Sequence, residues 1–144
     1  MSFRNPDLRN DDLILFRPTG RIELDLVRQS GWRCWPPRLP DQPIFYPVTS
    51  FDYAEKIARD WNSTQAAPEN LSFVTRFSIA ESATAAYPVQ NAGGREHQEL
   101  WVPAEELERF NQMIIGMIEV VAAYKNGSRI PDFDMSRLEH LLVG

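Results

Sequence analysis

Residues 97–107 read His97-Gln98-Glu99-Leu100-Trp101-Val102-Pro103-Ala104-Glu105-Glu106-Leu107. Apolar Leu100 and Val102 alternate with a carboxylate and a tryptophan, which is typical of a short strand with one buried face. Pro103 ends that strand and suits the first turn of a helix, where its missing N–H is no loss. Glu99 would stand on this strand beside an aromatic ring, where it is poorly hydrated. It is therefore either paired with a base or used in chemistry.

Length and composition indicate one globular domain. The chain has 144 residues, of which 43% are hydrophobic and 24% charged, enough to bury a core of its own. Its net charge of −5 argues against a nucleic-acid partner, although Arg28, Arg33 and Arg38 could form a local basic cluster. The lone Cys34 excludes an internal disulfide and fits a reducing cytoplasm.

Two further classes of protein are disfavoured by the sequence. No apolar run approaches the roughly 18 residues of a membrane span, and residues 1–12 are polar, unlike a signal peptide. We therefore expect no membrane partner and a cytoplasmic location. The two histidines, His97 and His140, have no Cys or His neighbours at metal-ligand spacing, so we expect no metal site.

The first elements follow from apolar runs and proline positions. Leu13–Phe16 predicts a buried strand that delivers Arg17 at its end. Pro18 is expected to end the ladder and Thr19 to cap the next helix, over Gly20–Ser30.

The next segment is rich in proline and tryptophan. Gly31–Pro43 can form neither a helix nor a central strand, so it predicts a stiff aromatic loop, which either covers the core or contacts a ligand. Ile44–Val48 predicts a second strand. Thr49 or Ser50 is expected to cap a helix over about Phe51–Trp61, which has helical apolar spacing.

The second half predicts two long strands and a helix. Leu71–Ile79 is the longest predicted strand, and Met113–Ala122 is expected to close the sheet, with Gly116 marking a bulge. A helical turn is expected within Ala80–Gly94, and a helix over Ala104–Gln112.

These elements favour an α+β fold. No three-glycine phosphate loop follows the first strand, which argues against a Rossmann sheet. We expect two small, mostly antiparallel sheets that form a cleft and are flanked by short helices. Residues 1–12 are predicted to be a flexible N-terminus, 13–125 the single domain, and 126–144 a linker and amphipathic helix. The helix carries Leu138 and Leu141, which could pack on the body or on a second copy.

Three polar features stand at the ends of the apolar strands, and together they resemble the ADP-ribosyltransferase fold. The three matching motifs are Phe16-Arg17-Pro18-Thr19-Gly20, Phe45-Tyr46-Pro47-Val48-Thr49-Ser50 and Gln98-Glu99-Leu100-Trp101-Val102-Pro103. The chain also resembles small bacterial proteins labelled ADP-ribosylation/crystallin-J-like, over roughly Leu15–Tyr124.

This resemblance implies that NAD is the substrate and assigns roles to the first two motifs. Arg17 would pair with a phosphate or a ribose of NAD, a task suited to a planar guanidinium. Tyr46, with Phe45 as the rival, would stack on nicotinamide. Thr49 or Ser50 would form hydrogen bonds that hold the pocket and its glutamate.

The third motif would supply the catalytic group. The resemblance implies that Glu99 binds the nicotinamide ribose and stabilises the oxocarbenium-like charge as the glycosidic bond breaks. Trp101 is a candidate ligand contact because it neighbours Glu99. Relatives that modify arginine carry Glu or Gln two residues before the catalytic glutamate; this chain has His97 there, a candidate general base, with Gln98 one residue off.

The sequence therefore predicts an NAD-dependent ADP-ribosyltransferase-like enzyme that passes ADP-ribose to an unidentified acceptor. Three alternatives stay open. The first is an NAD glycohydrolase, with water as acceptor. The second is a non-catalytic binding module or homodimer on the same fold. In the third, Arg17 and Glu99 form only a structural ion pair at the strand ends.

Overall fold

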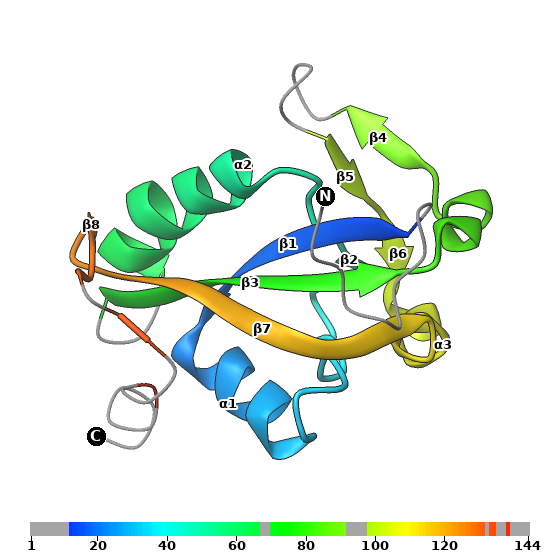
Figure 1. The fold of residues 1–144 in the computed structure, drawn as a ribbon, viewed down its shortest axis with the longest axis horizontal. Helices are drawn as coiled ribbons and strands as arrows, with labels where there is room; N and C mark the ends of the chain where they lie inside the picture. The colour runs from blue at the N-terminus through cyan, green and yellow to red at the C-terminus, as the bar shows by residue number, and fades with distance from the viewer. Residues whose placement is uncertain (1–11, 67–69, 92–97, 132, 135–137, 139–144) are drawn as a thin grey trace, which may run out of the picture.

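The computed structural model describes residues 12–66, 70–91, 98–131, 133–134 and 138. It has an α+β fold, as predicted, in which a four-stranded antiparallel sheet of order β1-β3-β7-β8 is accompanied by two two-stranded ladders, β2-β6 and β4-β5 (Figure 1). The strands are β1 (Leu13–Gly20), β2 (Ile44–Phe45), β3 (Leu71–Ile79), β4 (Val89–Asn91), β5 (Gln98–Leu100), β6 (Val102–Pro103), β7 (Ile114–Lys125) and β8 (Ser128–Arg129). The helical segments are α1 (Arg21–Gln29), α2 (Phe51–Lys56), η1 (Ile57–Ala66), η3 (Glu81–Ala85), η4 (Ala104–Glu106) and α3 (Leu107–Asn111).

Strand β3 is the centre of the sheet and has both faces covered. Successive side chains of a strand point to opposite faces. Phe73 packs in one cluster with Leu24 of α1. Its neighbour Val74 packs in another cluster with Ala54 of α2. The two helices therefore cover opposite faces of the sheet, as their positions on either side of the strands in Figure 1 show.

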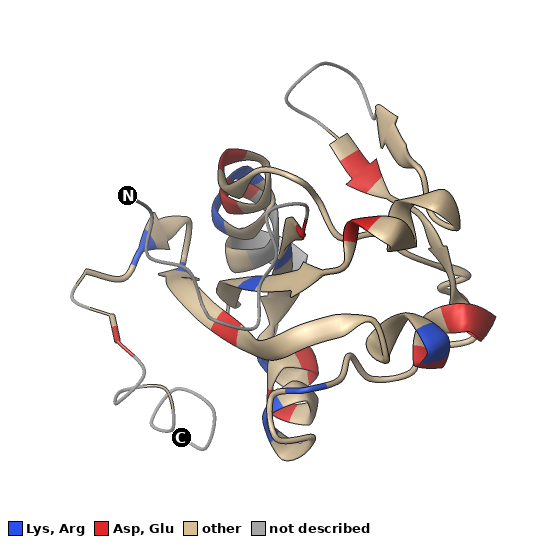
Figure 2. Cartoon of the chain, turned by 45° about the vertical axis from the view of Figure 1, so that its right-hand side comes forward, with Lys and Arg blue, Asp and Glu red and all other residues tan. Residues whose placement is uncertain are grey.

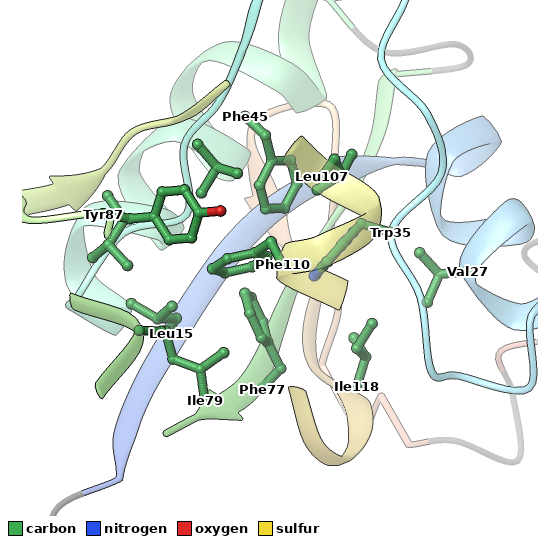
Figure 3. Close-up of a cluster of buried hydrophobic side chains, with 13 residues drawn as sticks. Leu15, Val27, Trp35, Phe45, Phe77, Ile79, Tyr87, Leu107, Phe110 and Ile118 are labelled. Carbon is green, nitrogen blue, oxygen red and sulfur yellow. The ribbon is translucent and has the colours of Figure 1, made fainter. Parts of the chain in front are cut away.

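The largest core cluster lies on the α1 face of the sheet, where aromatic rings meet edge to face (Figure 3). Phe110 of α3 stands at its centre and contacts the rings of Phe45, Phe77 and Tyr87. Trp35 from the proline-rich loop is 2% exposed and packs on Phe45 and Phe77. The loop was predicted either to cover the core or to contact a ligand, and through Trp35 it covers the core.

Strand β1 runs four residues beyond the predicted end, so the expectations for Arg17, Pro18 and Thr19 were wrong. The ladder to β3 continues to Gly20, and Arg17 lies inside the strand. Phe16 directs its N–H and C=O away from β3, toward Val48, and Pro18 has the same orientation two residues on. The backbone nitrogen of Pro18 therefore faces the outer edge of the sheet, and its lack of an N–H removes no hydrogen bond from the ladder between β1 and β3.

The helix after the second strand begins as predicted and ends later. Ser50 is the N-cap, and its side chain accepts a hydrogen bond from the Tyr53 N–H at 3.0 Å. Thr49, the other candidate, lies one residue before the cap. The helix continues from α2 into the wider turns of η1, which ends at Ala66 rather than near residue 61.

The strand predicted at residues 97–102 is divided into two. β5 pairs with β4, whereas β6 pairs with β2, and Trp101 lies between them outside either ladder. The following helix starts at Ala104 as one 3₁₀ turn and becomes α3, with Pro103 as its N-cap residue. One stretch of sequence thus joins two ladders and a helix.

Strand β7 carries the predicted bulge. Gly116 has a φ of +72°, a conformation that disfavours side chains with a Cβ, and the register against β3 shifts beside it. The chain does not leave the body after Lys125. Asn126 and Gly127 both have positive φ and turn it back as β8.

The far C-terminal residues fall mostly outside the described part of the chain. Leu138 is 2% exposed and belongs to the cluster of Leu24 and Phe73. It therefore packs on the body of its own chain, one of the two possibilities weighed above. The predicted partner in that helix, Leu141, lies outside the described residues, as do residues 1–11.

Candidate functional site

The candidate site opens at the outer edge of β1. Phe16 and Val48 exchange backbone hydrogen bonds of 2.8 Å, and Val48 also pairs with Glu99 of β5. The next outward-facing residue of β1 is Pro18, which has no N–H to continue this contact. A hollow of about 260 Å³ occupies this edge. It is lined by Arg17, Pro18, Arg38, Tyr46, Val48, Tyr53, Ile57 and Glu99.

Arg17 reaches the hollow with its charge already paired. The residue is 8% exposed, and its guanidinium donates through Nε and Nη2 to the two carboxylate oxygens of Glu23, at 2.6 and 2.9 Å. The same group lies 4.6 Å above the centre of the Phe45 ring. The expected alternative of an Arg17–Glu99 ion pair is therefore wrong: the partner of Arg17 is a residue of α1.

Glu99 is held by two neutral donors. The indole N–H of Trp101 donates to one carboxylate oxygen at 2.7 Å, and the Tyr53 hydroxyl donates to the other at 3.4 Å. Burial, followed by the negative charge of Glu99, raises the pKa of Tyr53 above its ordinary value. Within the described residues, no cation forms an ion pair with Glu99. Its orientation is thus fixed while its charge stays available.

The two candidates for stacking on nicotinamide differ in exposure. Tyr46 is 47% exposed and lines the hollow, so its side chain is accessible to a ligand. Phe45 is 1% exposed and is enclosed by Trp35, Phe110 and the Arg17 guanidinium. The proposed rival role of Phe45 is therefore wrong, because its ring has no free face.

Thr49 and Ser50 hold the walls of the hollow rather than lining it. The Thr49 N–H donates to the Gln98 carbonyl at 3.0 Å, and its hydroxyl approaches the same oxygen at 3.4 Å. This contact fixes the backbone next to Glu99. Ser50 caps the helix turn that carries Tyr53. Neither residue contacts Glu99 in these hydrogen bonds: Thr49 holds the adjacent Gln98, and Ser50 holds Tyr53, which donates to Glu99.

Tyr53 and Arg38 are the polar lining residues to which the sequence assigned no role in the site. A signal for Tyr53 existed: it stands three residues after the N-cap, in the first helical turn, close to the end of the second motif. Arg38 had been noted only as part of a possible basic cluster. No periodicity brings it to the hollow, because it lies on the irregular segment between α1 and β2.

Trp101 and His97 complete the predicted site residues. Trp101 is 48% exposed, and its ring lies next to the hollow through its hydrogen bond to Glu99. His97 lies outside the described residues, so its predicted role as a general base stays a prediction.

Two observations bear on other classes of site. Within the described part of the chain, no cluster of three or more His, Cys, Asp or Glu is placed to hold a metal ion. In the view of Figure 2, Lys and Arg are interspersed with Asp and Glu along the described elements.

The molecule is thus an α+β domain with a polar hollow at the edge of its sheet. No family model and no curated protein matches the chain. No helix among residues that the structure describes is long and apolar enough to cross a membrane.

Proposed function

We propose that the chain is an NAD-dependent ADP-ribosyltransferase-like enzyme, which cleaves the nicotinamide–ribose bond and transfers ADP-ribose to an acceptor. One observation carries this proposal. Arg17, Tyr46 and Glu99 come from three segments far apart in the sequence, and all three line one hollow. They are the residues in which the sequence resembles the three motifs of that fold.

The chemistry fits the groups present. As the glycosidic bond breaks, its electron pair leaves with nicotinamide and positive charge develops on the ribose. A carboxylate held in place beforehand stabilises such charge far better than mobile water does. Glu99 is held by Trp101 and Tyr53, and the exposed ring of Tyr46 offers a flat surface for nicotinamide.

The size of the hollow limits what it encloses. About 260 Å³ lies slightly below the usual range of roughly 300–1,000 Å³ for small-molecule sites. The nicotinamide riboside half of NAD would therefore occupy the hollow. The adenosine half would lie across its mouth.

Glu99→Gln tests this proposal. With NAD labelled in nicotinamide, we expect the variant to release label at least about 100-fold more slowly than the wild-type chain, because a neutral amide cannot stabilise the developing charge. Glu106→Gln is the matched control. Its carboxylate also accepts a hydrogen bond from a buried tyrosine, Tyr87, at 2.8 Å, but it does not line the hollow.

The outcome that refutes the proposal is equal release by the wild-type chain and Glu99→Gln, or no release by either.

A second label, placed on the adenylate of NAD, identifies the acceptor class where the wild-type chain releases nicotinamide. Label that becomes attached to a macromolecule or small acceptor indicates transfer. Label that remains free ADP-ribose indicates an NAD glycohydrolase.

A further inference from the structure

Arg38 differs from its neighbour Arg17 in having no acidic partner among the residues that the structure describes. It belongs to the segment between α1 and β2, and its guanidinium lies 5.9 Å from the centre of the Phe45 ring. Its Nε atom is buried and has no hydrogen-bond partner within the described part of the chain. Arg38 forms no ion pair with any carboxylate of the described residues, although it lines the hollow.

The surroundings disfavour this unpaired positive charge. Burial, followed by the positive charge of Arg17, lowers the pKa of Arg38. Glu23 lies near enough to offset part of this effect, but both of its oxygens accept from Arg17. The charges of two guanidinium groups, Arg17 and Arg38, are thus set against the single carboxylate of Glu23. An anion would remove the imbalance.

The two arginines are also unequal as donors. Arg17 directs one edge of its guanidinium to Glu23, whereas the Nε donor of Arg38 has no acceptor among the described residues. A planar guanidinium pairs with phosphate through two parallel hydrogen bonds, which makes it a suitable phosphate group binder. The packing on Phe45 would keep this fork in place.

We infer that Arg38, rather than Arg17, holds a phosphate group of the ligand in the hollow. This inference rests on the proposed function, in which the phosphate belongs to the pyrophosphate of NAD. Arg17 then serves as a positioning residue, which supports the Phe45 ring and Glu23. The lining of the hollow then supplies the Arg38 guanidinium for phosphate and the Glu99 carboxylate for the ribose.

Binding measurements on Arg38→Met test the inference. Methionine can retain the packing on Phe45 but loses the charge and the donors. By titration calorimetry, we expect the affinity for ADP-ribose and for inorganic pyrophosphate to fall at least about tenfold, as for the loss of a charge-assisted pair. The affinity for nicotinamide, which has no phosphate, should not change. Arg33→Met is the matched control: Arg33 lies exposed on the same segment, away from the hollow.

The outcomes separate this inference from the proposed function. If Arg38→Met binds ADP-ribose as tightly as the wild-type chain does, or if the wild-type chain binds neither phosphate ligand, the inference is overturned. In the first case the release of nicotinamide can still support the proposed function. If Arg38-dependent binding of pyrophosphate occurs without release of nicotinamide from NAD, the inference stands and the proposed function falls. Circular dichroism of each variant shows whether the fold is retained.

Discussion

At the scale of single residues, the hydroxyl of Tyr53 and the indole N–H of Trp101 decide what Glu99 can do. Both donate to its carboxylate, and neither carries a charge. A lysine or arginine in their place would have cancelled the negative charge that the proposed reaction needs. The structure keeps the charge and fixes its direction with neutral groups.

The titration of Tyr53 reports this arrangement without any assay of function. Its pKa is raised first by burial and then by the charge of Glu99. In Glu99→Gln the charge is gone while the burial remains. We therefore expect the pKa of Tyr53 to fall toward, but not to, its ordinary value of 10.0. Nuclear magnetic resonance of chains with labelled tyrosine rings measures this.

Tyr87 is the internal control for that titration. Burial and its hydrogen bond to Glu106 raise the pKa of Tyr87, so it should titrate at the same pH in both chains. If the pKa of Tyr53 is also the same in the wild-type chain and in Glu99→Gln, the contact between Tyr53 and Glu99 is absent in solution.

The site could be predicted in part at this scale. Arg17, Tyr46 and Glu99 were found through the order of three motifs, and the structure brings them to one hollow. The partner of Arg17 could not be predicted, because Glu23 follows only six residues later and looks like an ordinary helix-surface acid. Arg38 was missed because the path of an irregular segment leaves no periodic signal.

At the scale of elements, the most reliable predictions were those with a strong pattern. Strand β3 has the predicted bounds, and α1 lies within the predicted Gly20–Ser30. β1 was predicted too short because Pro18 was expected to end any ladder. An edge strand tolerates proline where the missing N–H faces outward, and only the sheet order shows which side that is.

One contact between elements joins α2 to β7. Tyr124 of β7 is fully buried and donates from its hydroxyl to Glu55 of α2 at 2.6 Å. Arg59 and Arg129 approach the same carboxylate at 3.7 Å. This contact fixes the helix that carries Tyr53 to the sheet. Burial and Glu55 raise the pKa of Tyr124 well above its ordinary value.

Tyr124→Phe should therefore destabilise the fold in a pH-dependent way. At neutral pH we expect a loss of about 1–3 kcal/mol in the free energy of unfolding, as for a hydrogen bond to a charged group. Because the folded pKa lies above the unfolded value of 10.0, the contribution of Tyr124 is complete below pH 10. It is lost as pH rises through the folded pKa.

Urea unfolding of the wild-type chain and Tyr124→Phe across this pH range measures the difference. The two stability curves should converge above pH 10. Tyr53 and Tyr87 are present in both chains, so their ionisation cancels in the comparison. A difference that stays constant with pH would contradict the assignment of the raised pKa to Tyr124.

At the scale of the whole molecule, the site depends on how the sheet edge is left open. Val48 bridges β1 and β5 at one position, and Pro18 prevents the contact from extending. The proline-rich segment brings Arg38 to one side of the gap, and α2 brings Tyr53 to another. The α+β class could be predicted from the element order. The meeting of the proline-rich segment, α2 and β5 at one edge of the sheet could not be predicted, because it depends on long-range packing.

The crystal structure of Glu99→Gln grown with NAD tests the central claim most directly, since slow turnover should leave NAD intact. We predict NAD with its nicotinamide riboside end in the hollow, the ring against Tyr46 and the ribose beside the substituted side chain at position 99. An empty hollow in crystals saturated with NAD, or NAD bound on another face of the molecule, would contradict the account.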